Sequence, residues 1–469
     1  MKRLLLLALT LSATQLFGQI TFDPTLVDNM QQTANAANTV TTGDFDGDGD
    51  IDFVGGSFQS DYFSLYINDG TGNFTRNTID NGSTADGARF AKAFDLDEDG
   101  DLDVLATSST ADLYLWYEND GSGLFSIHVI DDSAFSVEAY GIDAADFNND
   151  GTMDIVGGAN QGDALVIYAN DGNENFLIHS VLSVGDNRTD GVRVVKAVDL
   201  DQDTDVDIVV AAFSGDTFSW YENDGNAVFT PHTIDDSADA NGATAIEAAD
   251  LDGDGDLDLA AGSNNANHFL WYENDGNENF TSHIIDNTSS YSLGPRGLAL
   301  VDLEQDGDMD IVTAAITGDA FAWYENDGSG IFSGAIISND PTYSNGAFAI
   351  TTGDIDGDLV DDIVGAANIS DAFSWFKTEG IVILAVPSNP LELIEIYPNP
   401  VADQLYISLA EGISEISIEL YDSLGKLILG STYSGDRIHE LNTTSLPSGV
   451  YTLKLSTPEN TTSRKFIKL

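Results

Sequence analysis

The chain has 469 residues, with 79 Asp and Glu against 16 Lys and Arg and no cysteine, so its formal net charge is −63 at pH 7. So acidic a chain lacks the clustered Lys and Arg that phosphate contacts need, which argues against nucleic acid and anionic membranes as partners and favours cations. Hydrophobic residues make up 42% of the chain, enough for a packed core, so the charge does not indicate disorder. Stability must come from packing or metal rather than from disulfides.

The first 19 residues have the pattern of a secretory signal peptide. Lys2 and Arg3 precede a short apolar run that ends near small and polar residues at Gly18 or Gln19. The run is too short to cross a bilayer, and no other stretch of the sequence is long and apolar enough to do so. We therefore expect cleavage near residue 19, export and no transmembrane span. The alternative is that these residues form a buried first strand.

One acidic phrase recurs seven times along the chain. It reads DLDGDGDLD at residues 250–258, and the copies are 51 to 53 residues apart, beginning at Asp44, Asp95, Asp146, Asp199, Asp250, Asp302 and Asp354. A strand of small residues precedes each phrase, and an apolar strand, an aromatic strand such as HFLWYEN, an Asn-Asp-Gly turn and a last strand follow it. Four strands in each of seven units predict an all-β, seven-bladed β-propeller over residues 20–377.

The two ends of the repeat array complement each other. The seventh unit has its aromatic strand at residues 372–376 but no fourth strand after it, whereas residues 20–28 (ITFDPTLVD) resemble the last strand of the other units. We expect this N-terminal strand to complete the seventh blade, which closes the ring and leaves no sheet edge exposed.

The composition changes after about residue 390. Residues 19–390 hold 69 acidic and 8 basic side chains, whereas residues 391–469 hold 10 and 6. Residues 378–392 read as a proline-marked linker, and residues 393–469 as a small all-β domain, expected to be an Ig-like β-sandwich.

The phrases YPNPVADQLYISL, IELYDSLGKLIL, LPSGVYTLKL and RKFIKL in this tail resemble the C-terminal sorting domain of type IX secretion substrates. The resemblance covers nearly the whole tail. It implies export across the outer membrane of a diderm bacterium, with the type IX machinery as partner, and an extracellular or cell-surface location. The alternative is an ordinary Ig-like adhesion module.

Alternate acids around a glycine turn direct several oxygens at one point, which suits Ca²⁺, a hard cation that takes about six to eight oxygen ligands. The pattern D-x-D-x-D-G-x-x-D, flanked by strands, resembles the calcium loops of FG-GAP and VCBS repeats, the units of integrin-α-like propellers, over residues 20–377. That resemblance implies side-chain ligands at positions one, three, five and nine and a backbone carbonyl at position seven. The alternative is a set of solvated acidic turns.

Up to seven calcium ions are implied in this way. Their ligands at positions one, three, five, seven and nine, loop by loop, are Asp44, Asp46, Asp48, Asp50 and Asp52; Asp95, Asp97, Asp99, Asp101 and Asp103; Asp146, Asn148, Asp150, Thr152 and Asp154; Asp199, Asp201, Asp203, Asp205 and Asp207; Asp250, Asp252, Asp254, Asp256 and Asp258; Asp302, Glu304, Asp306, Asp308 and Asp310; and Asp354, Asp356, Asp358, Val360 and Asp362.

Four loops depart from the pattern. Asn148 removes one charge from the third loop, and the longer Glu304 is expected to crowd the ion in the sixth. Thr204 and Leu359 replace the sixth-position glycine in the fourth and seventh loops. Because this position is expected to need a positive φ, we predict weaker or distorted sites in these two loops.

One tryptophan position and one histidine position recur in several of the repeats. The tryptophans of the third strand are expected to lie in the core between blades, with sugar platforms as the alternative: Trp116, Trp220, Trp271, Trp323 and Trp375. The histidines of the fourth strand recur in different blades, so we expect no shared metal site: His128, His179, His232 and His283. His268 breaks this pattern. The chain has no nucleophile elbow, phosphate-binding glycine loop or zinc-binding H-E-x-x-H, while paired carboxylates for glycoside chemistry stay open.

Basic residues recur at the start of the innermost strands. Counting back six residues from each loop reaches Arg89, Arg193 and Arg296 in blades two, four and six. At the end of the propeller opposite the loops, these arginines are expected to form a cationic patch for carboxylate or sulfate groups of a ligand. The alternative is bracing between blades. Three residues further on, alternating signs indicate inter-blade salt bridges of that kind: Lys92, Asp143, Lys196 and Glu247.

These features predict a secreted, calcium-binding propeller that acts as an extracellular binding or adhesion module for glycans or surface proteins. The alternatives are an extracellular polysaccharide lyase or hydrolase on the same scaffold, and a scaffold without a ligand. The close likeness of the repeats favours binding, because a catalytic pocket needs acid, base and positioning groups in one place and so breaks the symmetry.

Overall fold

The computed structural model describes residues 20–379, apart from residues 174 and 185, and residues 395–397, 401, 404–408, 415–421, 426–434, 438–444, 446–447, 449–456 and 461–468. The expected signal peptide (residues 1–19) and most of the expected linker (residues 378–392) lie outside these residues. The chain divides into two compact units, Met1–Ile381 and Val382–Leu469. Within the described residues, no helix has the length and apolar character needed to cross a membrane.

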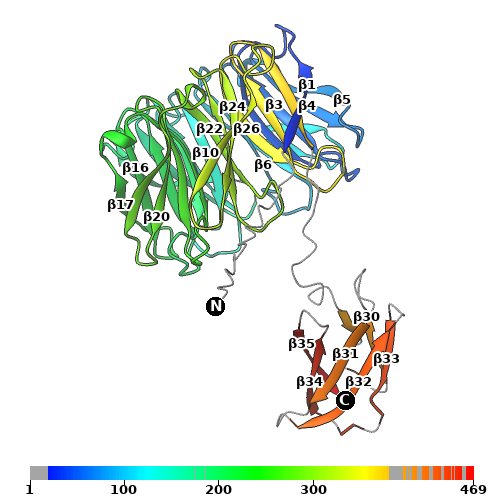
Figure 1. Ribbon diagram of the computed structural model, residues 1–469. Helices are drawn as coiled ribbons and strands as arrows, with labels where there is room; N and C mark the ends of the chain where they lie inside the picture. The colour runs from blue at the N-terminus through cyan, green and yellow to red at the C-terminus, as the bar shows by residue number, and fades with distance from the viewer. Residues whose placement is uncertain are drawn as a thin grey trace, which may run out of the picture. The chain divides into compact units, whose positions relative to one another are not determined.

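The first unit contains seven four-stranded antiparallel sheets (Figure 1). Six of them consist of four consecutive strands. Their bounds are β2 (Ala37–Gly43), β3 (Asp52–Ser57), β4 (Tyr62–Asn68) and β5 (Phe74–Asp80); β6 (Ala88–Phe94), β7 (Asp103–Ser108), β8 (Leu113–Asn119) and β9 (Phe125–Asp131); β10 (Ala139–Ala145), β11 (Asp154–Ala159), β12 (Ala164–Asn170) and β13 (Phe176–Val184); β14 (Val192–Val198), β15 (Asp207–Ala212), β16 (Thr217–Asn223) and β17 (Phe229–Asp235); β18 (Ala243–Ala249), β19 (Asp258–Ser263), β20 (His268–Asn274) and β21 (Phe280–Asp286); and β22 (Pro295–Val301), β23 (Asp310–Ala315), β24 (Ala320–Asn326) and β25 (Phe332–Ser338). Short 3-10 turns are η1 (Ser83–Ala85), η2 (Ala238–Ala240) and η3 (Ser290–Ser292).

The seventh sheet joins the two ends of this unit. Its order is β1-β28-β27-β26, with bounds β1 (Thr21–Asp28), β26 (Ala347–Gly353), β27 (Asp362–Ala367) and β28 (Ala372–Glu379). β1 runs antiparallel to β28, with Thr21 opposite Glu379. In Figure 1 the dark blue N-terminal strand lies among the yellow strands of the last repeat. The N-terminal strand therefore supplies the fourth strand that the last repeat lacks, as the sequence predicts.

The first strands of the seven sheets contact one another in a cycle. β2 contacts β6, each following first strand contacts the next, and β26 contacts β2 again. At this last junction the Thr42 hydroxyl donates to the carbonyl of Thr352 over 2.7 Å. The unit is thus an all-β array of repeated four-stranded sheets, consistent with a propeller.

The core lies between neighbouring sheets. All six residues of the second strand are buried in each of the seven sheets. These strands are rich in Gly, Ala and Val because aromatic rings of the adjacent sheet pack closely against them. At Gly55, for example, an added Cβ would lie only 2.8 Å from the ring of Phe373, which is too close. Small residues on one sheet and large rings on the next therefore fit the sheets together.

A tyrosine–aspartate hydrogen bond joins five pairs of neighbouring sheets. In each pair the hydroxyl in the third strand of one sheet donates to a carboxylate at the end of the fourth strand of the preceding sheet. The pairs are Tyr66–Asp28 (2.9 Å), Tyr117–Asp80 (3.1 Å), Tyr168–Asp131 (2.9 Å), Tyr272–Asp235 (2.9 Å) and Tyr324–Asp286 (3.0 Å). Because Asp28 ends β1, the first of these bonds links the N-terminal strand to the first repeat.

The second unit also consists of strands. One sheet has the order β29-β30-β33 and the other β32-β31-β34-β35, with bounds β29 (Glu395–Tyr397), β30 (Gln404–Ser408), β31 (Glu415–Tyr421), β32 (Leu427–Ser434), β33 (Ile438–Asn442), β34 (Gly449–Ser456) and β35 (Thr461–Lys468). Residues of both sheets, among them Leu405, Ile407, Ile418 and Leu453, share one buried cluster.

Replacing Tyr66 by Phe is expected to destabilise the first unit. The change keeps the buried ring but leaves the Asp28 carboxylate with one hydrogen bond fewer, a loss of about 1–3 kcal/mol. We expect a lower urea midpoint with an unchanged m-value. Tyr62→Phe is the matched control, because the Tyr62 hydroxyl only accepts a hydrogen bond from exposed Asn81. Equal midpoints for the two variants would contradict a role for this bond in joining the ends.

Candidate functional site: acidic loops and an arginine cluster

Each acidic phrase lies between the first and second strands of a sheet. In five of the loops, one carboxylate oxygen from each of positions one, three and five lies within 4.8 Å of the others: Asp44, Asp46 and Asp48; Asp95, Asp97 and Asp99; Asp199, Asp201 and Asp203; Asp250, Asp252 and Asp254; and Asp354, Asp356 and Asp358. Backbone N–H groups hold these carboxylates in place. Asp44, for example, accepts from Gly47 and Gly49 over 2.9 and 3.0 Å.

The sixth position of the loops has a positive φ, as expected. The angle is 95° at Gly49, 85° at Thr204 and 71° at Leu359. A β-branched Thr and a Leu are unfavourable in this region, so the fourth and seventh loops hold strained residues that the other loops avoid with glycine.

Burial and like-charged neighbours raise the pKa of four third-position carboxyls. In the first loop, burial raises the pKa of Asp46, and the neighbouring carboxylates of Asp48 and Asp44 raise it further. Asp97, Asp201 and Asp252 are raised by burial and by like-charged neighbours in the same way. A bound cation would relieve this repulsion, and hard oxygen ligands suit a divalent ion such as calcium.

The ninth-position aspartates are fully buried within the sheets. In the first loop the Asp52 carboxylate accepts from the backbone N–H of Phe45 (3.1 Å) and of Asn68 (2.8 Å), which ties the loop to the third strand. Burial raises the pKa of Asp52 to about 7, although these two hydrogen bonds lower it. A carboxylate has about four lone-pair sites, so two remain after these bonds.

The third and sixth loops form no cluster of three carboxylates among the described residues. The third loop has the neutral Asn148 at position three. In the sixth, burial and the nearby Asp310 carboxylate raise the pKa of Glu304 to about 9. The longer side chain of Glu304 therefore interacts with the buried ninth-position aspartate of its own loop.

In the seventh loop a lysine contacts the acidic cluster. The Lys377 ammonium, from β28, contacts the Asp356 carboxylate and lies 3.3 Å from that of Asp358. These hydrogen bonds raise the pKa of Lys377. In four other repeats a glutamate stands at this position of the third strand: Glu118, Glu222, Glu273 and Glu325. This contact of Lys377 was not predicted from the sequence, although the lysine stands where four other repeats have a glutamate.

Three of the four glutamates at this position pair with histidines of the fourth strand. Glu118 contacts His128 over 2.7 Å, Glu222 contacts His232 over 2.8 Å and Glu273 contacts His283 over 2.7 Å. Each of these histidines stacks on the tryptophan of its sheet, at 4.6 to 4.7 Å between ring centroids. The same arrangement recurs in three sheets, so the structure keeps these histidines apart. His268 instead begins β20, with Nδ1 3.4 Å from the Asp239 carboxylate.

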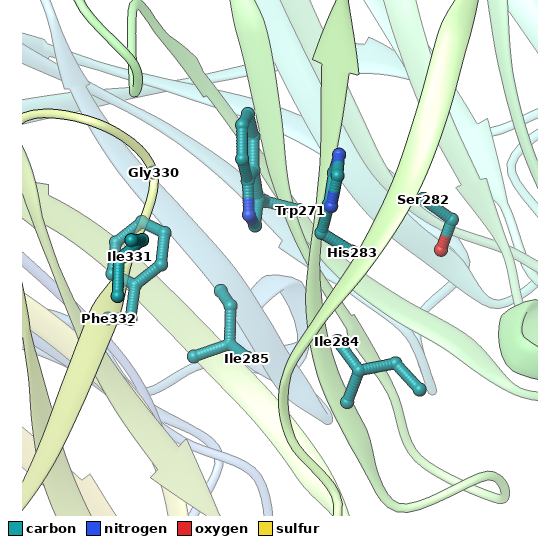
Figure 2. Close-up of a pocket in the computed structure, with 8 residues that line it drawn as sticks. All are labelled: Trp271, Ser282, His283, Ile284, Ile285, Gly330, Ile331 and Phe332. Carbon is teal, nitrogen blue, oxygen red and sulfur yellow. The ribbon is translucent and has the colours of Figure 1, made fainter.

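The tryptophans of the third strands are buried, with at most 7% exposed. Trp271 lines a pocket between the fifth and sixth sheets, beside His283, Ile285, Ile331 and Phe332 (Figure 2). Figure 2 shows the Trp271 and His283 rings side by side. Because little of Trp271 is exposed, these aromatic residues serve the core between sheets rather than an open sugar platform.

The three arginines converge at the start of the innermost strands. Arg89 and Arg296, from the second and sixth sheets, both donate to the Tyr140 hydroxyl, over 2.6 and 3.3 Å. The guanidinium of Arg193 lies 3.3 Å from the ring centroid of Phe213 and 5.5 Å from that of Tyr140. Arg89 and Arg296 also stack on Phe348, at 5.4 and 4.7 Å. We call these three arginines with Tyr140 and Phe348 the arginine cluster.

Charges in the arginine cluster shift the pKa values of its members. Burial raises the pKa of Tyr140, but the charges of Arg296, Arg89 and Arg193 outweigh this and lower it to about 8. Burial, together with the other two arginines, lowers the pKa of Arg193 to about 10.

The lysines three residues further on are paired with acids. Lys92 contacts Asp143, and Lys196 contacts Glu247, in each case across neighbouring sheets. The bracing that the alternating signs indicate is therefore present for the lysines.

Comparison with known proteins agrees with this arrangement. A model of the FG-GAP-like repeat matches residues 44–106, 95–157, 146–210, 199–261, 250–313 and 302–365, so each match runs from one acidic loop through the next. The chain belongs to the FG-GAP-like repeat family. A secretion system C-terminal sorting domain matches residues 395–469 of this FG-GAP-like protein. This tail marks proteins that the type IX system exports to the cell surface or the extracellular space.

Two curated relatives match the FG-GAP-like protein over a short stretch. An endo-acting ulvan lyase of Formosa agariphila is 31% identical over 99 residues, which is 21% of this chain and 19% of the lyase. An ulvan lyase of Nonlabens ulvanivorans is 30% identical over 98 residues, 21% of this chain and 18% of the lyase. The chain thus spans about a fifth of the length of these relatives.

Solved structures resemble the FG-GAP-like protein only distantly. A periplasmic gluconolactonase of Pseudomonas aeruginosa has 13% identity and a TM-score of 0.45, over 64% of this chain and 84% of that one. AofleA of Arthrobotrys oligospora has 12% identity and a TM-score of 0.42, over 68% and 90%.

The pKa of Tyr140 predicts an early step in an alkaline titration. We expect one of the 16 tyrosines to ionise near pH 8, measured by ultraviolet difference absorbance, and Tyr140→Phe to remove this step. Between about pH 8 and the ordinary value of 10.0, the unfolded state binds more protons at this residue, so stability linked to Tyr140 rises with pH. Tyr62→Phe should leave the early step unchanged. A titration with no early step would show that the arginine charges do not lower the pKa of the Tyr140 hydroxyl.

Proposed function

We propose that this protein is a secreted, seven-bladed β-propeller that binds calcium in its acidic loops and acts as an extracellular binding or adhesion module for glycans or surface proteins. The observation that carries the proposal is the recurrence of equal carboxylate clusters in the first, second, fourth, fifth and seventh loops of one exported repeat array. Seven sheets whose first strands contact one another in a cycle support the blade count. We also propose that residues 1–19 are the signal peptide and that the two sheets of the tail form an Ig-like sandwich, supported by their shared core.

Calcium would be held chiefly by the first five loops. Positions one, three and five supply side-chain oxygens, position seven a carbonyl, and the buried aspartate at position nine its remaining lone pairs. The third loop is the weakest of these in charge because of Asn148, and the fourth carries the strain of Thr204. The sixth loop directs Glu304 toward Asp310, and the seventh already holds Lys377. We therefore propose five ions rather than seven.

Restoring the glutamate of the other repeats is expected to create one more calcium site. Lys377→Glu removes the ammonium from Asp356 and Asp358, so the number of bound ions should rise from five to six, measured by equilibrium dialysis and metal analysis. Lys92→Ala is the control, because Lys92 pairs with Asp143 away from the loops. An unchanged count in Lys377→Glu would show that the lysine does not occupy the site, or that Leu359 prevents binding by itself; Lys377→Glu combined with Leu359→Gly separates these two causes.

Binding should depend on calcium because the loops lie within the fold. Calcium that binds only the folded state stabilises it, by about 2.7 kcal/mol for each site at a hundredfold excess over Kd. We expect excess chelator to lower the melting temperature clearly, and a glycan array probed with and without chelator to show binding that requires calcium. An unchanged melting temperature would overturn the calcium proposal, and an array and surface-protein screen without any ligand would overturn the binding proposal.

A polysaccharide lyase is the second candidate. It is favoured by the likeness to two ulvan lyases, over about a fifth of their length. Incubation of the full chain with acidic polysaccharides would test it, because a lyase creates unsaturated sugar ends that absorb ultraviolet light. Product formation would establish an enzyme, whereas binding without product supports the module.

A further inference from the structure

Within residues 20–379, the first unit pairs its few basic side chains with acids, with three exceptions. Residues 20–379 contain eight Lys and Arg. Five of them lie within 4.0 Å of a carboxylate: Arg76 at Asp28, Lys92 at Asp143, Arg188 at Asp186, Lys196 at Glu247 and Lys377 at Asp356. Arg89, Arg193 and Arg296 have no such partner among the described residues. In so acidic a unit, three unpaired cations in one place need an explanation.

The guanidinium groups have unused hydrogen-bond donors. Nε of Arg89, Arg193 and Arg296, and Nη1 of Arg193, are buried and donate to no described residue. The charge of Glu138 acts on Arg193, but the Glu138 carboxylate accepts a hydrogen bond from Asn160 over 2.8 Å. Leaving buried charged donors unsatisfied costs more than leaving neutral ones unsatisfied, so the arginine cluster is stabilised by whatever anion pairs with it.

Aromatic packing leaves these donors available. Phe213 covers a face of Arg193, and Tyr140 covers a face of Arg89. Phe348 lies against both Arg89 and Arg296. Cation–π contacts use the face of a guanidinium, whereas its N–H groups point outward in its plane. The rings thus fix the orientation of the arginines and leave their edges for a planar or tetrahedral oxyanion, a geometry that arginine matches better than lysine does.

The neighbouring lysines show the contrast. Lys92 and Lys196 lie three residues after Arg89 and Arg193 on the same strands, and each pairs with an acid of the next sheet. At the corresponding positions around the arginine cluster, the other sheets supply Asn38, Tyr140, Thr244 and Phe348, none of them acidic. The protein therefore balances one layer of cations internally and leaves the other without counter-charge.

We propose that Arg89, Arg193 and Arg296 form a binding site for one oxyanion, the carboxylate or sulfate group of an acidic polysaccharide. The site lies at the start of the innermost strands, whereas the acidic loops follow their ends, so the loops repel an anion least there. This inference deepens the proposed binding function and rests on it for the nature of the ligand.

Isothermal titration calorimetry of the full chain with sodium sulfate and with glucuronate tests the site, at constant ionic strength and with calcium present. We expect saturable binding of one anion per chain, weakened about tenfold or more in Arg193→Gln and partly restored in Arg193→Lys. Arg193 is the informative position because it donates no hydrogen bond to the described residues. Arg188→Gln is the matched control, since Arg188 already pairs with Asp186.

A second measurement covers the case in which Arg193→Gln does not fold. Crystals of the unaltered protein soaked in selenate should show the ion in contact with at least two of the three guanidinium groups. Absence of both saturable anion binding and bound selenate would overturn the site, as would equal affinity in Arg193→Gln and Arg188→Gln. If neutral glycans bind the protein while sulfate and glucuronate do not, the proposed binding function stands and this inference fails.

Discussion

A buried carboxylate in each of the seven sheets holds the repeat together. In six of the sheets the ninth-position aspartate accepts backbone N–H groups from the start of the acidic loop and from the end of the third strand, as Asp52 does from Phe45 and Asn68. In the third sheet Asp154 accepts only from Asn170 among the described residues. One side chain therefore fixes the loop relative to two strands. Because a buried carboxylate is costly without such bonds, the loop, the second strand and the third strand must form together.

This constraint also explains why the loops are so crowded. With the ninth position fixed inside the sheet, the carboxylates of the first, third and fifth positions lie close together in five of the loops, where they repel one another. The chain meets this repulsion in different ways. In the sixth loop burial and Asp310 favour the neutral form of Glu304, and in the seventh Lys377 supplies a positive charge from the protein itself. In the third loop the neutral Asn148 removes one charge. The first, second, fourth and fifth loops contain nothing that offsets the repulsion, which is the physical basis for proposing calcium there.

Periodic features of the fold could be predicted from the sequence, and individual side-chain partners could not. The constant spacing predicted the repeated sheets, and the incomplete last repeat predicted the place of β1. The sixth-position glycines of the other loops predicted the positive φ found at Thr204 and Leu359. These depend on backbone geometry, which a repeat imposes equally on every copy. The contact of Lys377 with the seventh loop was missed, because it depends on how a long side chain turns. For the same reason the sequence placed Arg89, Arg193 and Arg296 in one layer without showing the rings that orient them.

The pairing of β1 with β28 has a mechanical consequence. Thr21 lies opposite Glu379, so the first strand begins beside the point from which the chain leads to its sorting tail. A pull on the tail of a molecule held at a cell surface enters through β28, which is hydrogen-bonded to β27 on one side and to β1 on the other. Such a force acts along the strands and loads the hydrogen bonds of both strand pairs at once. A pull between the two ends of the unit would instead separate β1 from β28 one hydrogen bond at a time. The pairing of β1 with β28 therefore resists a force applied through the tail far better than a force that pulls the two ends of the unit apart.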